Sequence, residues 1–245
     1  MQIIKKFAAT MAVALLVAAN GAVAAGQQAY YTGEKIKGYD KGSFVVLRGD
    51  DVNFRASAET GRVLKVLPHH SLLRVLEQDG KWLKADSDGV SGYIYADYTG
   101  SGVKDELTQE DFALGYAVLG TRFDRQQADA HLGRLQKEAV DKKRKCTDYA
   151  YAGAVISVAK KKQLVQAIRV TDSKYITMRG VSVGDSAGRA VGQYGLPDAV
   201  VYDAQKTTYE YLWQDAAGQE LRFALEVGTD SRVQAIILEA LPKKR

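Results

Sequence analysis

Five short runs rich in β-branched and aromatic residues, between Val52 and Tyr98, constrain the fold more than any other feature. The first is Val52-Asn53-Phe54-Arg55 and the last is Gly92-Tyr93-Ile94, and each run is closed by Gly, Asp or Ser. Such runs predict short antiparallel strands joined by tight turns. Five of them within about 50 residues predict a small all-β barrel over residues 43–99.

The first 25 residues have the pattern of a signal peptide. Lys5 and Lys6 precede an uncharged apolar run over residues 7–19, and Ala22-Val23-Ala24 is a small-x-small cleavage site. The run is shorter than the roughly 20 residues that a membrane-spanning helix needs. We therefore predict export to the periplasm, cell wall or extracellular space without a stable membrane anchor. Residues 26–42 are polar and lack periodicity, which predicts a linker.

Composition places the chain among globular proteins, with 46% hydrophobic and 26% charged residues. The net charge of +5 is a mild positive bias that suits an anionic polymer. No RNA- or DNA-binding motif accompanies the bias, so nucleic acid is not a predicted partner. The single cysteine, Cys146, leaves no possibility of an internal disulfide.

Residues 107–241 contain an apparent internal repeat. Tyr149-Ala150-Tyr151 is followed by Val165-Gln166-Ala167-Ile168, and Tyr209-Glu210-Tyr211 is followed by Val233-Gln234-Ala235-Ile236. The repeat predicts two α+β units, over residues 107–172 and 176–241, each with helix preceding an antiparallel meander. The complete fold is then mixed: a small barrel followed by helices packed on antiparallel sheet.

Capping signals locate the expected helices. In the second unit Asp185 can cap a helix that carries apolar residues on one face and ends at Gly195. In the first unit Thr108-x-x-Asp111 predicts a helix through Leu119, and Asp124-x-x-Gln127 predicts another. Strands are expected at 148–151, 155–159, 164–170, 207–213, 219–226 and 232–238.

The barrel segment resembles the bacterial SH3 domain. Val52-Asn53-Phe54-Arg55 matches that family's Val-Asn-Val-Arg-like strand, and Trp82 and Gly92-Tyr93-Ile94 fit its closing hairpin. The resemblance implies binding to peptidoglycan or an anionic wall polymer. The aromatic residues could stack on a ligand, or Trp82 and Tyr93 could fill the barrel core. The candidate ligand-binding residues are Arg55, Trp82, Tyr93, Tyr95 and Tyr98.

The second α+β unit resembles the β-lactamase-inhibitor-protein and SmpA/BamE-like superfamily. The residues that carry this likeness are Gly180-Val181-x-Val183-Gly184-Asp185-Ser186 and Tyr194-Gly195-x-Pro197. The resemblance implies an open sheet face that binds an envelope protein. Aromatic residues concentrate on the predicted sheet, where they could dock a partner or pack under the helix. The candidate partner-binding residues are Tyr202, Tyr209, Tyr211, Trp213 and Phe223.

No pattern for catalysis, a cofactor or a metal ion is found. His69 and His70 are adjacent, so on a strand they point to opposite faces and cannot share one metal ion. Acidic pairs fall in turns, and no Cys–His–polar triad marks a wall hydrolase. We therefore expect a non-enzymatic envelope protein in which the barrel binds the wall and the α+β units bind a protein. The alternative is a soluble inhibitor or assembly factor with a purely structural barrel.

Overall fold

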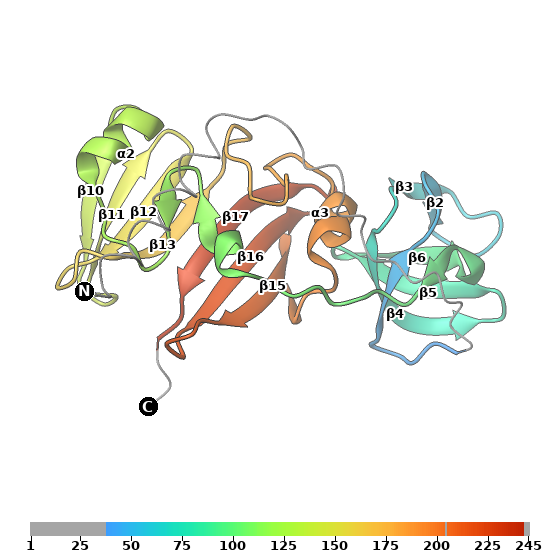
Figure 1. The fold of residues 1–245 in the computed structure, drawn as a ribbon. Helices are drawn as coiled ribbons and strands as arrows, with labels where there is room; N and C mark the ends of the chain where they lie inside the picture. Colours follow the sequence, from blue (N-terminus) through green and yellow to red (C-terminus); the bar gives the residue numbers. More distant parts are fainter. Residues whose placement is uncertain (1–37, 204, 243–245) are drawn as a thin grey trace.

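The computed structural model describes residues 38–203 and 205–242, and their structure is mostly β. A curled seven-stranded sheet lies at one end of the molecule, and an eight-stranded antiparallel sheet forms the rest (Figure 1). A two-stranded hairpin lies between them in the sequence. The predicted signal peptide and most of the predicted linker lie outside the described residues.

The seven-stranded sheet, with the residues that lead into it, is called here the N-terminal unit (residues 38–100). Its order is β3-β2-β6-β5-β4-β1-β7. The five predicted runs are confirmed as β2 to β6, and β1 and β7 add to them. Phe54, Leu83 and Ile94 alternate with outward-facing residues and are fully buried, so period-two patterning builds this core. The strands are β1 (Phe44–Leu47), β2 (Val52–Arg55), β3 (Val63–Leu67), β4 (Leu72–Asp79), β5 (Trp82–Ser87), β6 (Val90–Tyr95) and β7 (Thr99–Gly100).

The end of the predicted linker packs against the N-terminal unit. Tyr39 contacts its core, and the Tyr39 hydroxyl donates a 3.0 Å hydrogen bond to the carbonyl of Ala96. Thr99 Oγ1 lies 3.0 Å from the same hydroxyl. The structure describes only residues 38–42 of the predicted linker, so the linker stays a prediction, and within this part Tyr39 packs against the N-terminal unit.

The eight-stranded sheet has the order β10-β11-β12-β13-β17-β16-β15-β14. Two antiparallel meanders meet at their last strands, with Ile168 of β13 opposite Leu238 of β17. The two halves are therefore one continuous sheet. The strands are β10 (Lys137–Asp141), β11 (Cys146–Tyr151), β12 (Ala154–Ala159), β13 (Val165–Val170), β14 (Ala199–Tyr202), β15 (Lys206–Gln214), β16 (Glu220–Gly228) and β17 (Val233–Ala240).

One α-helix precedes each meander. Helix α2 (Arg125–Leu132) is capped by Asp124, which accepts from the backbone N–H of Gln127 at 3.0 Å, as predicted. Helix α3 (Ala187–Tyr194) ends at Gly195, also as predicted, but its cap is Ser186 rather than Asp185. Asp185 instead accepts from the backbone of Ser182 at 2.8 Å and closes the turn before the helix.

The predicted helix from Thr108 to Leu119 is wrong. Thr108 and Asp111 do form a capping box, but it opens only the short 3₁₀ helix η2 (Gln109–Phe112). Gly115 follows with a φ of +61°, which favours glycine and turns the chain into a hairpin. That hairpin pairs β8 (Ala113–Leu114) with β9 (Ala117–Val118). The remaining short element, η1 (Ala96–Tyr98), follows β6.

Helix α3 contacts the second half of the sheet through an aromatic cluster. The Tyr194 ring stacks on Phe223 of β16 at a centroid distance of 4.4 Å, and Tyr211 of β15 lies 5.6 Å from Phe223. All three side chains are at most 1% exposed. Such rings contribute large buried apolar area together with edge and stacking attraction.

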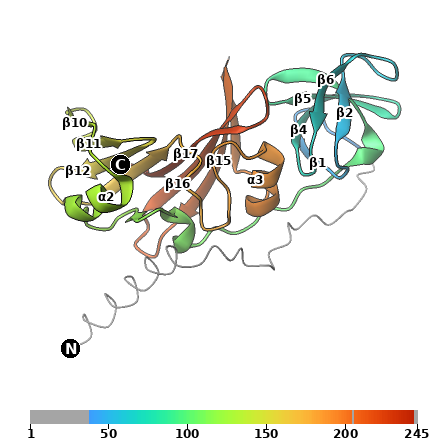
Figure 2. The ribbon, with the colours of Figure 1, turned by 90° about the horizontal axis from the view of Figure 1, so that it is seen from above.

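The N-terminal unit and the second half of the sheet share buried polar contacts. The Tyr209 hydroxyl donates to Asp88 Oδ1 at 2.6 Å, and Lys65 Nζ donates to Ser231 Oγ at 3.1 Å. Burial raises the pKa of the Asp88 carboxyl. On α3, a Cβ at Gly188 would lie 2.3 Å from the carbonyl oxygen of His69, so glycine permits the close approach. Figure 2 shows α3 on the side that faces this unit.

Glu226 connects the two halves of the sheet. Its carboxylate accepts from Arg169 of β13 at 2.6 and 3.0 Å and from Lys206 of β15 at 2.5 Å. The Arg169 hydrogen bonds lower the pKa of Glu226 to about 2. Between about pH 2 and the usual glutamate pKa, the Glu226 carboxyl binds a proton in the unfolded chain but stays ionised in the folded protein. The contribution to stability is therefore complete above roughly pH 4.3 and is lost as the pH falls toward 2.

We therefore expect Glu226→Gln to destabilise the protein at pH 7, with a difference from wild type that narrows as the pH falls below about 4. Urea unfolding measured at a series of pH values tests this. Glu77→Gln, on the exposed end of β4, is the control and should leave the pH profile unchanged. A difference between Glu226→Gln and wild type that stays constant from pH 7 to pH 3 would contradict the assignment.

Candidate functional site

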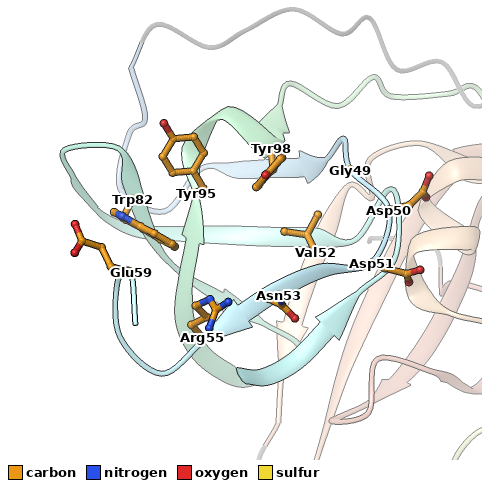
Figure 3. A pocket seen from close by; sticks show the side chains of 10 residues that line it. All are labelled: Gly49, Asp50, Asp51, Val52, Asn53, Arg55, Glu59, Trp82, Tyr95 and Tyr98. Atoms are coloured by element: carbon orange, nitrogen blue, oxygen red, sulfur yellow. The ribbon is translucent and has the colours of Figure 1, made fainter. Parts of the chain in front are cut away.

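A groove with a volume of about 550 Å³ lies on the N-terminal unit. Strands β2, β5 and β6 supply its floor and aromatic side, and the β1–β2 and β2–β3 turns supply its rim (Figure 3). Strand alternation explains the arrangement, because residues two apart on a strand share a face. The lining residues are Gly49, Asp50, Asp51, Val52, Asn53, Arg55, Glu59, Trp82, Tyr95 and Tyr98.

Three aromatic rings form a series along one side of the groove. The Trp82 and Tyr95 rings meet edge to face at 5.7 Å, and the Tyr95 and Tyr98 rings do so at 5.8 Å. Trp82 is opposite Tyr95 in the β5–β6 pairing, and Tyr98 follows in η1. Tyr98 is 48% exposed, so part of this aromatic area is available to a ligand. Flat sugar faces and extended peptides are the ligands that such surfaces stack against.

The charged residues that line the groove have an excess of carboxylates, with Glu59 beside Trp82 and with Asp50 and Asp51 at the other end (Figure 3). Arg55 is the single cation, and its Nη1 donates to the carbonyl of Gly61 at 2.9 Å. Asp50, Asp51 and Glu59 are the acidic residues of the rim. Asp50 lies 3.5 Å from His69 Nδ1, and its side chain is 80% exposed. The groove therefore favours a neutral or cationic ligand over a polyanion.

The structure brings four of the five predicted ligand-binding residues together. Arg55, Trp82, Tyr95 and Tyr98 line the groove, whereas Tyr93 does not, although it is opposite Arg55 in the β2–β6 pairing. Trp82 is only half-buried and lies outside the core of the unit. The three rim carboxylates were missed, because acidic residues in turns usually indicate nothing more than solvation.

The predicted partner-binding face is mostly covered, which corrects that prediction. Tyr209, Tyr211 and Phe223 are at most 1% exposed, because the strand face that carries them packs under α3 and against the N-terminal unit. Trp213 is half-buried and stacks on Phe112 at 5.4 Å. Tyr202 is half-buried beneath the Arg74 guanidinium at 4.4 Å. These residues serve as core and internal contacts.

The remaining candidates for chemistry are dispersed. His69 and His70 lie in the β3–β4 turn and not on a strand, so their rings do not point to opposite faces as expected but lie 4.0 Å apart. His131 of α2 stacks on Tyr116. Cys146 is 1% exposed, and burial raises the pKa of its thiol. Within the described part of the chain, no group of three or more His, Cys, Asp or Glu residues could hold a metal ion. Over the same residues, no helix has the length and apolar character that would let it span a bilayer.

Comparisons with known proteins give little further information. No family model and no curated protein matches the sequence. A DUF4309 family protein (YjgB) from Bacillus subtilis is 18% identical with a TM-score of 0.31, covering 48% of this chain and 78% of that one. An extracellular protein containing an SCP domain from Bacillus anthracis is 10% identical with a TM-score of 0.33, covering 56% and 49%. The C-terminal domain of TagH is 9% identical with a TM-score of 0.24, covering 81% and 96%. TM-scores this low do not define a shared fold.

Proposed function

We propose that this chain is an exported, non-enzymatic binding protein of the bacterial cell envelope. In this proposal the N-terminal unit is an SH3b-like barrel that contacts peptidoglycan, and the helix-plus-sheet part is an α+β module that contacts an envelope protein. The observation that carries the proposal is the groove, in which Trp82, Tyr95 and Tyr98 form a series of edge-to-face aromatic rings along one side. The signal-peptide pattern of residues 1–25 supports export.

The groove is better suited to binding than to catalysis. A glycosidase acid needs a carboxyl that an apolar environment keeps protonated, whereas the Asp50 side chain is 80% exposed. The groove lining contains no Cys, Ser or His that could act as a nucleophile or its base. Its acidic rim disfavours an anionic wall polymer as the ligand of this groove, and the uncharged sugar rings of peptidoglycan are the part that would contact the aromatic side.

Retention of the purified protein on cell-wall sacculi tests the groove. We expect Trp82→Ala and Tyr98→Ala each to weaken binding about tenfold, roughly 1.4 kcal/mol, because each removes one stacking ring. Ile176→Ala is the control, since Ile176 is 54% exposed and lies outside the groove. The idea fails when wild type shows no retention at low salt, or when both groove variants are retained as strongly as the control.

The second candidate is a soluble inhibitor or assembly factor in which the barrel is structural. The contacts of Asp88 with Tyr209 and of Lys65 with Ser231 favour it, because they hold the N-terminal unit against the sheet. This candidate predicts one stoichiometric protein partner on co-purification and no affinity for sacculi. The sacculus experiment therefore separates the two candidates.

A further inference from the structure

Two lysine-rich turns that are separate in the sequence lie side by side at the end of the molecule away from the groove (Figure 1). Cys146 pairs with Ala159 where β11 begins and β12 ends, and the backbone N–H of Lys160 donates to the carbonyl of Lys145 at 3.1 Å. The turns thus extend from the same end of adjacent strands, about 5 Å apart. Together they are called here the basic turns: Lys142, Lys143, Arg144 and Lys145, with Lys160, Lys161 and Lys162.

All seven residues of the basic turns are exposed, and the six lysines among them are available to a ligand. Arg144 is the exception, because it pairs with Asp141 at 2.7 Å and with Asp148 at 2.8 Å and so fixes the first turn. None of the six lysines forms an ion pair with any residue of the described ranges. Seven cations therefore lie in two neighbouring turns, and Asp141 and Asp148, which both pair with Arg144, are the only carboxylates that form ion pairs with them in the described part of the chain.

The charges of the molecule are therefore separated between its two ends. The groove combines three carboxylates with Arg55, and the basic turns extend from the first half of the sheet at the opposite end (Figure 1). A polyanion is attracted to the second surface and repelled by the first. The surface that suits an anionic polymer is therefore the basic turns and not the groove.

We propose that the basic turns bind a phosphodiester polymer of the polyol-phosphate type. Lysine ammonium groups are compact, mobile point charges, which suit phosphates on a flexible chain better than one fixed bidentate ligand. The turns contain no large apolar side chain, which a protein inserting into a lipid surface would use. They also contain no aromatic ring on which a nucleic-acid base could stack.

Titration of the purified protein with poly(glycerol phosphate) at several salt concentrations tests this proposal. Lys160→Gln/Lys161→Gln/Lys162→Gln removes three phosphate contacts. We expect it to reduce the slope of log K against log salt by about 2, as release of counterions from three phosphates requires. Lys142→Gln/Lys143→Gln/Lys145→Gln should give a similar reduction, because the two turns act as one surface.

A variant with the same net charge as the two triple-lysine variants, but with its substitutions outside the basic turns, is the control. Lys41→Gln/Arg62→Gln/Lys81→Gln removes three exposed cations from the N-terminal unit and should leave the slope unchanged. An equal reduction in this variant would show that only net charge matters and would overturn the proposal. Binding to anionic phospholipid vesicles or to single-stranded DNA that is tighter than binding to poly(glycerol phosphate) would overturn the assignment to a polyol phosphate. Trp82→Ala should leave polymer binding unchanged, so failure of the groove proposal remains distinguishable.

Discussion

Phe223→Ala is expected to destabilise the protein by roughly 3–5 kcal/mol. Phe223 is completely buried, and its ring is held between Tyr194 and Tyr211. Truncation loses the transfer free energy of the ring and leaves a cavity among side chains anchored on two strands and a helix. Because those elements have little freedom to collapse, the cost belongs in the upper part of the range for core substitutions. The free energy of urea unfolding measures it.

Leu212→Ala is the matched control for Phe223→Ala. Leu212 is on β15, the strand next to Phe223, but is 38% exposed, so its truncation should cost less than about 1 kcal/mol. Phe223→Leu should fall between the two, because it keeps apolar volume without the ring contacts. Equal losses for Phe223→Ala and Leu212→Ala would mean that the aromatic cluster is not the centre of this core.

Arg179→Met is expected to cost a similar amount, roughly 3–5 kcal/mol. The Arg179 side chain is 7% exposed and donates two hydrogen bonds, at 2.7 and 2.8 Å, to Asp111, which is 3% exposed. It also donates to the carbonyls of Glu106 at 2.7 Å and Gln193 at 3.1 Å. Methionine keeps much of the volume but leaves the buried Asp111 carboxylate without its cation. Thermal and urea unfolding report the loss.

Two further variants separate the charge from the geometry at this position. Arg179→Lys keeps the charge but not the planar fork that bonds both oxygens of Asp111, so we expect partial recovery. Arg179→Met/Asp111→Leu removes the buried pair and should recover part of the stability lost by Arg179→Met. The recovery is incomplete because Asp105 also pairs with Arg179 and because Asp111 also caps the backbone of Thr108. The surface pair Lys174–Asp172, at 3.8 Å, is the control, and Lys174→Met should cost under 1 kcal/mol. A loss for Arg179→Met no larger than this would refute the buried-pair interpretation.

The sequence predicts most of the inner strands of both sheets, because strands that bury one face show clear alternation. The exception is β1, an inner strand of the seven-stranded sheet whose four residues are all apolar and therefore show no alternation. It misses β10 and β14, which are the edges of the eight-stranded sheet. An edge strand has one neighbour and buries less, so its residues can be charged, as in Lys137–Asp141. The capping box of Thr108 and Asp111 is real, but local signals do not show that the helix it opens stops at Phe112 and that a hairpin follows at residues 113–118.

The candidate sites, like the strands, could be predicted from the sequence only in part. The aromatic side of the groove is visible in the sequence, since Trp82, Tyr95 and Tyr98 stand out in a barrel-like segment. The acidic rim is not, because turn carboxylates are common on any surface. The two basic turns are each visible, but their proximity depends on the number of strands between them. Once β10 is known to pair with β11, the two hairpins must turn at the same end of the sheet.

The antiparallel pairing of β13 with β17 has a consequence for how the molecule assembles. Strand β17 is the last of the described strands to be synthesised, and it is the one that bridges the halves. Until it emerges, β13 and β16 each lack a neighbour, and the earlier meander remains an open template for wrong pairing. A chaperone that protects exposed strand edges would act on this intermediate. A truncation that removes β17 would leave the chain in it, with the edges of β13 and β16 unpaired.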